Sequence, residues 1–153
     1  MRKLFLSVFV IFFAVTFSLA DDTIFQHVSV PYSKGKQAKA VMIFSDDHKA
    51  VEVHPSRRAA ISIPYDKIDK CSYEYTNKHR VSEGSIATAA VGVGAIVMLT
   101  KSRSHWLEID YHEQDIPKVF VLRMDKDNYL RILEALKTHT GIEAEILGNA
   151  DKR

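Results

Sequence analysis

Short stretches rich in β-branched and aromatic residues fill much of the region 39–124 and predict a series of β-strands. In several of them every second residue is apolar, which is typical of a strand with one buried and one solvated face. The predicted strands are residues 39–44, 51–53, 59–65, 71–75, 105–111 and 119–124, separated by turn-forming residues at 45–48, 54–58 and 116–117. This order predicts an antiparallel meander.

A different period follows the last strand and predicts one amphipathic helix. Its apolar residues are spaced i, i+3, i+4 and i+7, at Tyr129, Ile132, Leu133 and Leu136. Asp125 or Asp127 can cap the start of this helix, and Gly141 can end it. We therefore expect a mainly β fold of the α+β class: an antiparallel, partly closed barrel with a C-terminal amphipathic helix that plugs one end.

Two parts of this pattern resemble a known group of folds. Residues 61–68 read Ile-Ser-Ile-Pro-Tyr-Asp-Lys-Ile, which is similar to the I-x-I-P-Y-x-x-I strand and turn of bacterial PH-like (pleckstrin-homology-like) and GRAM-like modules. Residues 105–109, 119–122 and 129–136 are similar to the ending of the same modules. The chain also looks like a family of small exported proteins of unassigned function. The resemblance covers residues 39–141 and implies a PH-like domain that binds lipids or peptides and is not a catalyst.

The first twenty residues have the three parts of a secretory signal peptide. Basic Arg2 and Lys3 precede an apolar run over residues 4–17, and Ser18 and Ala20 are the small residues that a signal peptidase reads. An uncleaved anchor is the alternative, but the run is shorter than the ~20 residues that cross a bilayer. We therefore expect export, to the periplasm or outside the cell. The expected divisions are a signal peptide at 1–20, an N-terminal segment and linker at 21–38, the PH-like domain at 39–141 and a C-terminal tail at 142–153.

The most unusual segment is an apolar insertion rich in Gly and Ala, at residues 84–100. Its uncharged part, residues 86–99, would span about 21 Å as a helix, less than the ~30 Å interior of a bilayer. A membrane crossing there would also keep the strands on either side from pairing. Three alternatives remain. The segment packs on its own domain, it self-associates through small residues spaced four apart, or it enters a lipid surface or a partner groove.

Candidate binding residues come from this insertion, from the basic residues beside it and from the tryptophan that follows. They are Ile86, Val91, Val93, Ile96, Val97, Leu99, Arg80, Lys101, Arg103 and Trp106. Basic residues at both ends of the insertion suit anionic headgroups, and they also suit ordinary solvated loops. Trp106 is either an exposed contact residue or a partly buried residue of the sheet.

The composition limits the class of function. The 153 residues include 21 Lys and Arg and 19 Asp and Glu, and Arg2 and Lys3 lie in the leader, so the exported chain is neutral. Neutrality removes the bulk electrostatic argument for binding nucleic acid. The single cysteine, Cys71, has no intramolecular partner, and its place in a strand favours a buried, unreactive thiol.

The sequence contains no motif for catalysis or for a cofactor. Its seven His residues are scattered, with no H-E-x-x-H and no Cys pair, so no metal site is expected. There is no G-x-S-x-G and no phosphate-binding loop, so we expect no enzyme activity and no cofactor. The sequence predicts an exported, non-enzymatic module, peripheral to a membrane, that docks on a lipid surface or a protein partner at the cell envelope. The alternative is a structural, homo-oligomeric envelope subunit with residues 84–100 as its interface.

Overall fold

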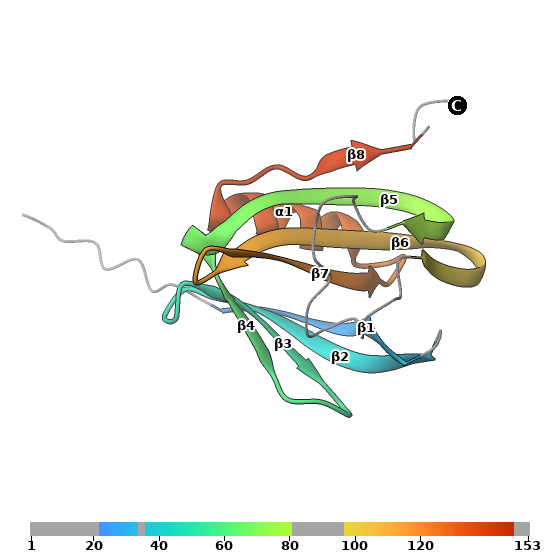
Figure 1. Cartoon of the computed structure of the whole chain (residues 1–153), viewed down its shortest axis with the longest axis horizontal. Coiled ribbons are helices and arrows are strands. Elements are labelled where there is room, and N and C mark those ends of the chain that lie inside the picture. Colours follow the sequence, from blue (N-terminus) through green and yellow to red (C-terminus); the bar gives the residue numbers. More distant parts are fainter. Residues whose placement is uncertain (1–21, 34–35, 81–96, 149–153) are drawn as a thin grey trace, which may run out of the picture.

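The computed structural model describes residues 22–33, 36–80 and 97–148, which form strands, one α-helix and a short 3-10 helix (Figure 1). The strands are β1 (Thr23–Ser33), β2 (Lys36–Ser45), β3 (Ala50–Pro55), β4 (Ile61–Pro64), β5 (Ile68–Arg80), β6 (Val97–Glu113), β7 (Ile116–Met124) and β8 (Glu145–Leu147). The 3-10 helix η1 (Tyr65–Lys67) follows β4, and the helix α1 (Tyr129–Thr140) follows β7. A mainly β fold with one C-terminal helix is therefore confirmed.

All these strands belong to one eight-stranded sheet, in the order β4-β3-β2-β1-β7-β6-β5-β8. Neighbours are antiparallel except β5 and β8, which run parallel. The registered pairing of β1 with β7 is limited to Ser29 opposite Arg123, and the two halves of the sheet diverge from this seam (Figure 1). The expected antiparallel, partly closed barrel is wrong, because the described sheet is open and mixed. β8 pairs with the outer edge of β5 and forms the end of the described sheet on that side.

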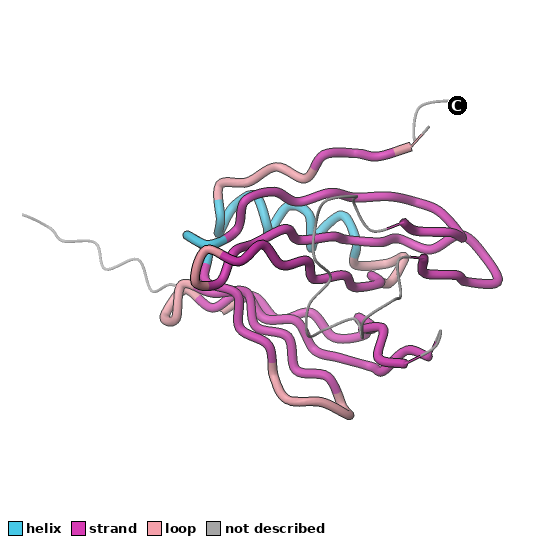
Figure 2. Tube along the Cα trace, viewed as in Figure 1, coloured by secondary structure: helices cyan, strands magenta, loops and turns pink. Residues whose placement is uncertain are grey.

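One hydrophobic core joins both halves of the sheet to α1. Phe44 of β2, Phe120 of β7 and Leu136 of α1 are among its largest fully buried side chains. The predicted apolar stripe of the helix is confirmed, since Ile132 and Leu136 are fully buried and Leu133 packs at the edge of the core. Figure 2 shows this single helix lying against strands and turns. In the part of the chain that the structure describes, no helix is long and apolar enough to cross a membrane.

The two ends of α1 differ in how well they were predicted. Gly141 ends the helix as expected, in the left-handed conformation with φ 74°, and its N–H donates to the oxygen of Lys137 at 2.9 Å. The N-cap residue is Asn128 and not Asp125 or Asp127, and its side chain makes no capping hydrogen bond. The first turn is held by the backbone, because the oxygen of Asp125 accepts the N–H of the first helical residue at 3.0 Å.

Residues 23–33 belong to the sheet, although the sequence predicted a segment outside the domain. β1 pairs with β2 and β7, and Phe25, Val28 and Val30 are buried in the core. A bulge between Phe25 and Val28 turns two residues that are three apart toward the same core, and His27 within it has φ 66°. Because the bulge interrupts the alternation of buried and exposed residues, this segment lacks the regular pattern from which a strand is predicted. The domain therefore begins at Thr23, well before residue 39.

Two other predicted boundaries are also wrong. The reversal between β6 and β7 lies at Gln114 and Asp115, which have φ 51° and 63°, whereas Ile116 and Pro117 belong to β7. Residues 145–147, expected in a tail, form β8 and pair with residues 72–74 of β5. An ion pair between Lys70 and Glu145 adds to this contact. The C-terminal segment is therefore part of the domain as far as β8.

Candidate functional site

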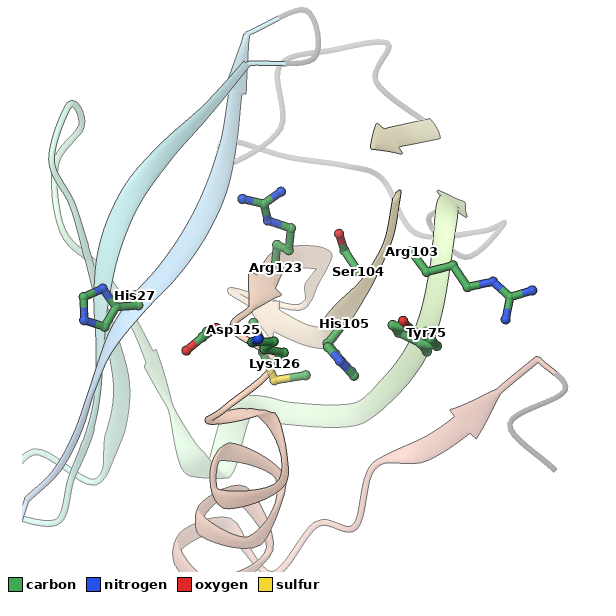
Figure 3. Close-up of a pocket in the computed structure, with 9 residues that line it drawn as sticks. His27, Tyr75, Arg103, Ser104, His105, Arg123, Asp125 and Lys126 are labelled. Atoms are coloured by element: carbon green, nitrogen blue, oxygen red, sulfur yellow. The ribbon is translucent and has the colours of Figure 1, made fainter. Parts of the chain in front are cut away.

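An open pocket of about 510 Å³ lies beside the seam between β1 and β7 (Figure 3). Its lining comes from β1, β5 and β6, from the end of β7 and from the turn before α1. The lining residues are His27, Tyr75, Arg103, Ser104, His105, Arg123, Met124, Asp125 and Lys126. We call this cavity the basic pocket.

Irregular backbone directs several of these side chains. His27 has φ 66° in the β1 bulge, and a bulge turns a side chain away from the regular alternation of its strand. Asp125 and Lys126 lie in the turn between β7 and α1, where the backbone of Asp125 also holds the first turn of the helix. The directions of these groups are therefore set by a bulge and a turn as well as by strand alternation.

Positive charge dominates the basic pocket, because Arg103, Arg123 and Lys126 share it with one carboxylate, Asp125. In Figure 3 the side chains of Arg103 and Arg123 extend in opposite directions, and Arg123, which is opposite Trp106 in the register, leaves β7 on the other face of the sheet from His105. The guanidinium carbon of Arg103 lies 6.0 Å from the centre of the Tyr75 ring. Neither Arg123 nor Lys126 forms an ion pair with another described residue. Cations that lack acidic partners and line a cavity attract anions.

His105 belongs to a group of stacked rings that connects β5, β6 and α1. The rings of Tyr75 and Tyr129 stack on its imidazole, with centroid distances of 4.6 Å and 3.9 Å. Tyr73 packs beside Tyr129 at 5.7 Å and beside His105 at 6.0 Å. Aromatic pairs of this kind add about 0.5–1.5 kcal/mol beyond the burial of their surface. We call these four residues the tyrosine–histidine stack.

Hydrogen bonding and burial determine the charge state of His105. The hydroxyl oxygen of Tyr73 lies 2.7 Å from Nδ1 of His105. Burial raises the pKa of Tyr73 to about 12, so its hydroxyl stays protonated at neutral pH and is able to donate to Nδ1 or to accept from it. Burial also lowers the pKa of His105 below its usual value of 6.5, an effect that Asp125 partly opposes. At neutral pH the imidazole is therefore neutral and carries one proton, on Nδ1 or on Nε2.

The structure separates the binding residues predicted from the sequence. Arg103 lines the basic pocket. Four others belong to the paired ends of β5 and β6, namely Arg80, Val97, Leu99 and Lys101, with Arg80 opposite Val97 and Leu99 opposite Lys78. Ile86, Val91, Val93 and Ile96 lie outside the described residues, as does most of the predicted 84–100 insertion.

Trp106 is not a surface contact, which corrects one of our predictions. Its side chain is 0% exposed, and its indole N–H donates to the backbone oxygen of Thr76 at 3.2 Å. Glu108, on the same face of the strand, is 1% exposed, so the middle of β6 is buried on both faces. The prediction failed because alternation shows which residues share a face and does not show what covers that face.

Sequence reasoning also missed most of the basic pocket. His27, Tyr75, His105 and Arg123 come from four different strands, and no local spacing relates them. The sequence offered one weak signal, the Arg123–Lys126 stretch with its two cations and one acid after a predicted strand. The same pattern is common at ordinary solvated turns.

A second polar constellation centres on His139, near the end of α1. Its Nδ1–H donates to Asp46 at 3.0 Å, and its Nε2 lies 3.0 Å from the hydroxyl oxygen of Thr23. The ring stacks on Phe44 with a centroid distance of 5.4 Å, and the side chain is only 10% exposed. The order of acid, imidazole and hydroxyl is that of a hydrolase triad. Here the imidazole is packed against Phe44, so the contact ties α1 to β1 and to the turn after β2.

Other candidate ligand sites are limited. A cavity of about 460 Å³ is lined by Lys36, Gln37, Ala38, Lys39, Ser56 and Arg57, at the start of β2 and beyond β3. Within the described ranges, no three His, Cys, Asp or Glu side chains are grouped so that they could hold a metal ion. Cys71 is buried as predicted, and burial raises its pKa to about 12, so the thiol stays protonated.

Comparisons with known proteins add little to this description. No family model matches the chain, and no curated protein matches its sequence. One solved structure that is similar is described as the structure of the Spt16D Pob3N heterodimer, with a TM-score of 0.49 and 13% sequence identity. The alignment covers 88% of this chain and 60% of that chain, so this chain spans three fifths of its length. The function of the protein has to be inferred from its own residues.

Proposed function

We propose that the protein is an exported, non-enzymatic binding module that docks on an anionic lipid surface at the cell envelope. The observation that carries this proposal is the basic pocket, where three cationic side chains share one cavity with a single carboxylate. At the surface of an anionic membrane each Lys or Arg contributes about 1 kcal/mol of attraction. The phosphate of a lipid headgroup is the anion that this pocket would receive.

The order of elements supports a PH-like module, with bacterial PH-like and GRAM-like domains as the proposed relatives. Seven strands precede one amphipathic helix that packs on the core, which is the order implied by the sequence resemblance. β1 supplies the strand that the sequence did not reveal. A fold alone does not assign a ligand, so the lipid follows from the pocket and not from the architecture.

The state of the reactive groups supports a binding role. The Cys71 thiol is buried and protonated, so it is a poor nucleophile. His139 is held between Asp46 and Thr23 in a packed position. In the basic pocket, the imidazole of His105 is stacked between two tyrosine rings, and its Nδ1 is engaged by the hydroxyl of Tyr73 at 2.7 Å. The surroundings of Cys71, His139 and His105 therefore suit structural or ligand-binding roles.

The apolar insertion has a place in this proposal. In sequence it joins β5 to β6, the strands that supply Tyr75, Arg103 and His105 to the basic pocket. Lys101 and Arg103 follow it directly along β6. We propose that residues 86–99 enter the lipid surface while the basic pocket engages a headgroup, a combination of apolar and cationic contacts that is typical of proteins lying at a membrane interface.

Vesicle sedimentation tests the proposal. The purified protein is mixed with vesicles of phosphatidylcholine alone or with added phosphatidylglycerol, and all variants carry the same N-terminus so that any effect of residues 1–20 cancels. Binding is expected only with phosphatidylglycerol. Arg123→Gln and Lys126→Gln should each weaken it about fivefold, the equivalent of ~1 kcal/mol per charge. Lys67→Gln, which removes an exposed charge on η1, is the matched control and should bind like the wild type.

Three outcomes would overturn the proposal. One is equal sedimentation with neutral and anionic vesicles, because the basic pocket would then have no part in docking. Another is a discrete oligomer in gel filtration that binds no vesicle, which would favour the alternative of a structural envelope subunit. A loss of binding in Lys67→Gln equal to that in Arg123→Gln would show that overall charge, and not the basic pocket, attracts the membrane.

A further inference from the structure

His105 is more constrained than a packing residue needs to be. Two aromatic rings stack on its imidazole, and a third residue, Tyr73, bonds its Nδ1 at 2.7 Å. A phenylalanine could fill the same space between the rings without any polar requirement. The hydrogen bond adds a polar contact that packing alone does not need, and its direction decides which ring nitrogen carries the proton.

The tautomer depends on the direction of this hydrogen bond. When the Tyr73 hydroxyl donates to Nδ1, the imidazole proton lies on Nε2, and this is the arrangement that the proposal below adopts and tests. No hydrogen bond between described residues uses Nε2 of His105. Since His105 lines the basic pocket, this N–H is a donor that a molecule in the pocket can satisfy.

The exposed cations of the pocket differ from His105 in how they attract an anion. Arg103 and Lys126 are exposed, so part of their attraction acts over a distance and is screened by salt. His105 is half-buried and held by other rings, so its hydrogen bond would be short-ranged and directional. The two kinds of group differ in how their contributions depend on ionic strength.

We propose that His105 is the specificity-determining residue of the basic pocket, and that its Nε2–H donates a hydrogen bond to a phosphate oxygen of the bound headgroup. Tyr73 is the positioning residue that keeps this proton on Nε2. The inference rests on the proposed lipid docking and adds to it a neutral, preset donor that distinguishes a seated phosphate from a nearby negative charge. The cations attract the surface, and His105 recognises the group that enters the pocket.

The experiment measures binding to phosphatidylglycerol vesicles at about 0.05 M and about 0.5 M salt, which changes the screening length roughly threefold. His105→Phe keeps the ring and removes the donor, and we expect about a tenfold loss of binding at both salt concentrations. Arg123→Gln should weaken binding mainly at low salt. His105→Gln, which restores an N–H near the position of Nε2, should bind within about twofold of the wild type.

A matched control and a spectroscopic measurement separate recognition from structure. His112→Gln changes a histidine on the same strand that pairs with Asp69 outside the pocket, and it should bind like the wild type. In ¹⁵N NMR spectra the imidazole of His105 should show one tautomer, protonated at Nε2. Tyr73→Phe should produce a mixture of tautomers together with a partial loss of binding. Added inorganic phosphate should shift the Nε2 resonance of the wild type.

The outcomes distinguish this inference from the proposed function. If the wild type binds anionic vesicles and His105→Phe binds equally well, His105 has no recognition role and docking by the cations stands. If the wild type binds no vesicle, lipid docking fails, and the response of Nε2 to inorganic phosphate still decides whether His105 contacts phosphate. Should His105→Phe fold poorly, His105→Gln and Tyr73→Phe carry the test, and a Tyr73→Phe protein with an unchanged tautomer would contradict the proposal.

Discussion

Replacing Leu136 by Ala is expected to lower the free energy of unfolding by about 2–5 kcal/mol. Leu136 is 0% exposed, in the core cluster that joins α1 to both halves of the sheet. The substitution removes most of a buried side chain and leaves a cavity between the helix and the strands. The loss is expected in the upper part of the range if β2 and α1 cannot close around the cavity, because the cost grows with the residual volume.

Two other leucines of α1 are matched controls. Leu130 is 64% exposed, so Leu130→Ala should change stability by no more than about 0.5 kcal/mol. Leu133 packs at the edge of the core, so Leu133→Ala should cost an intermediate ~1–2 kcal/mol. All three substitutions replace Leu by Ala in one helix and make the same small change in helix propensity. Differences among them therefore report burial.

Urea denaturation followed by circular dichroism measures the three variants. A lower midpoint with an unchanged slope would indicate lost stability without a change in the surface exposed on unfolding. The predicted order of loss is Leu136, then Leu133, then Leu130. Equal losses at Leu130 and Leu136 would refute the reasoning, since the helix could not then be docked through the face that contains Ile132 and Leu136.

Four further predictions concern single groups. Thr23→Val should cost about 1 kcal/mol in urea denaturation by removing the hydroxyl beside His139, and an unchanged midpoint would contradict this. Cys71 should resist a thiol reagent in the native protein and react once the protein is denatured. Rapid labelling of the native protein would show that the Cys71 thiol is accessible to solvent. Acidification below about pH 6.5 should reduce the stability contributed by His105, because its pKa is lower in the folded than in the unfolded chain and the unfolded chain takes up the proton first. His105→Gln should flatten that part of the pH profile of the unfolding free energy. The mass of the exported protein should correspond to cleavage after Ala20, and a retained leader would contradict export.

The elements that the sequence predicted well are those whose pattern is local. The stripe of α1 and the glycine that ends it depend on residues within a few turns, so periodicity revealed both. β1 was missed because the bulge near His27 interrupts the alternation. β8 was missed because three exposed or half-exposed residues give no pattern, and its pairing with β5 depends on where α1 ends.

The basic pocket could not be predicted for a different reason. Its residues come from four strands and a turn, and His27 joins the others only because β1 lies beside β7, a pairing between strands far apart in sequence. The sequence singles out Arg103 for its place beside the apolar insertion, whereas Arg123 lies within a predicted strand and His105 stands out only as a basic residue that follows the insertion. Trp106 shows a related limit, since the sequence leaves open whether this aromatic residue among acidic neighbours is an exposed contact or a buried residue of the sheet, and the structure buries it fully. The elements that cover a strand are determined by the packing of the whole folded domain, which the residues of that strand do not reveal.

β1 begins the domain in sequence and lies at the centre of the sheet in space. β2, β3 and β4 follow it as hairpins, so the first half of the sheet can form from contacts between near neighbours as soon as residue 64 is free. The seam with β7 has to wait for Arg123, and closing so long a loop makes it the slow, high-contact-order step of folding. A chain that is threaded through a membrane unfolded would therefore emerge with half a sheet and an exposed apolar face for most of its passage. The basic pocket, which is built around that seam, would be completed last.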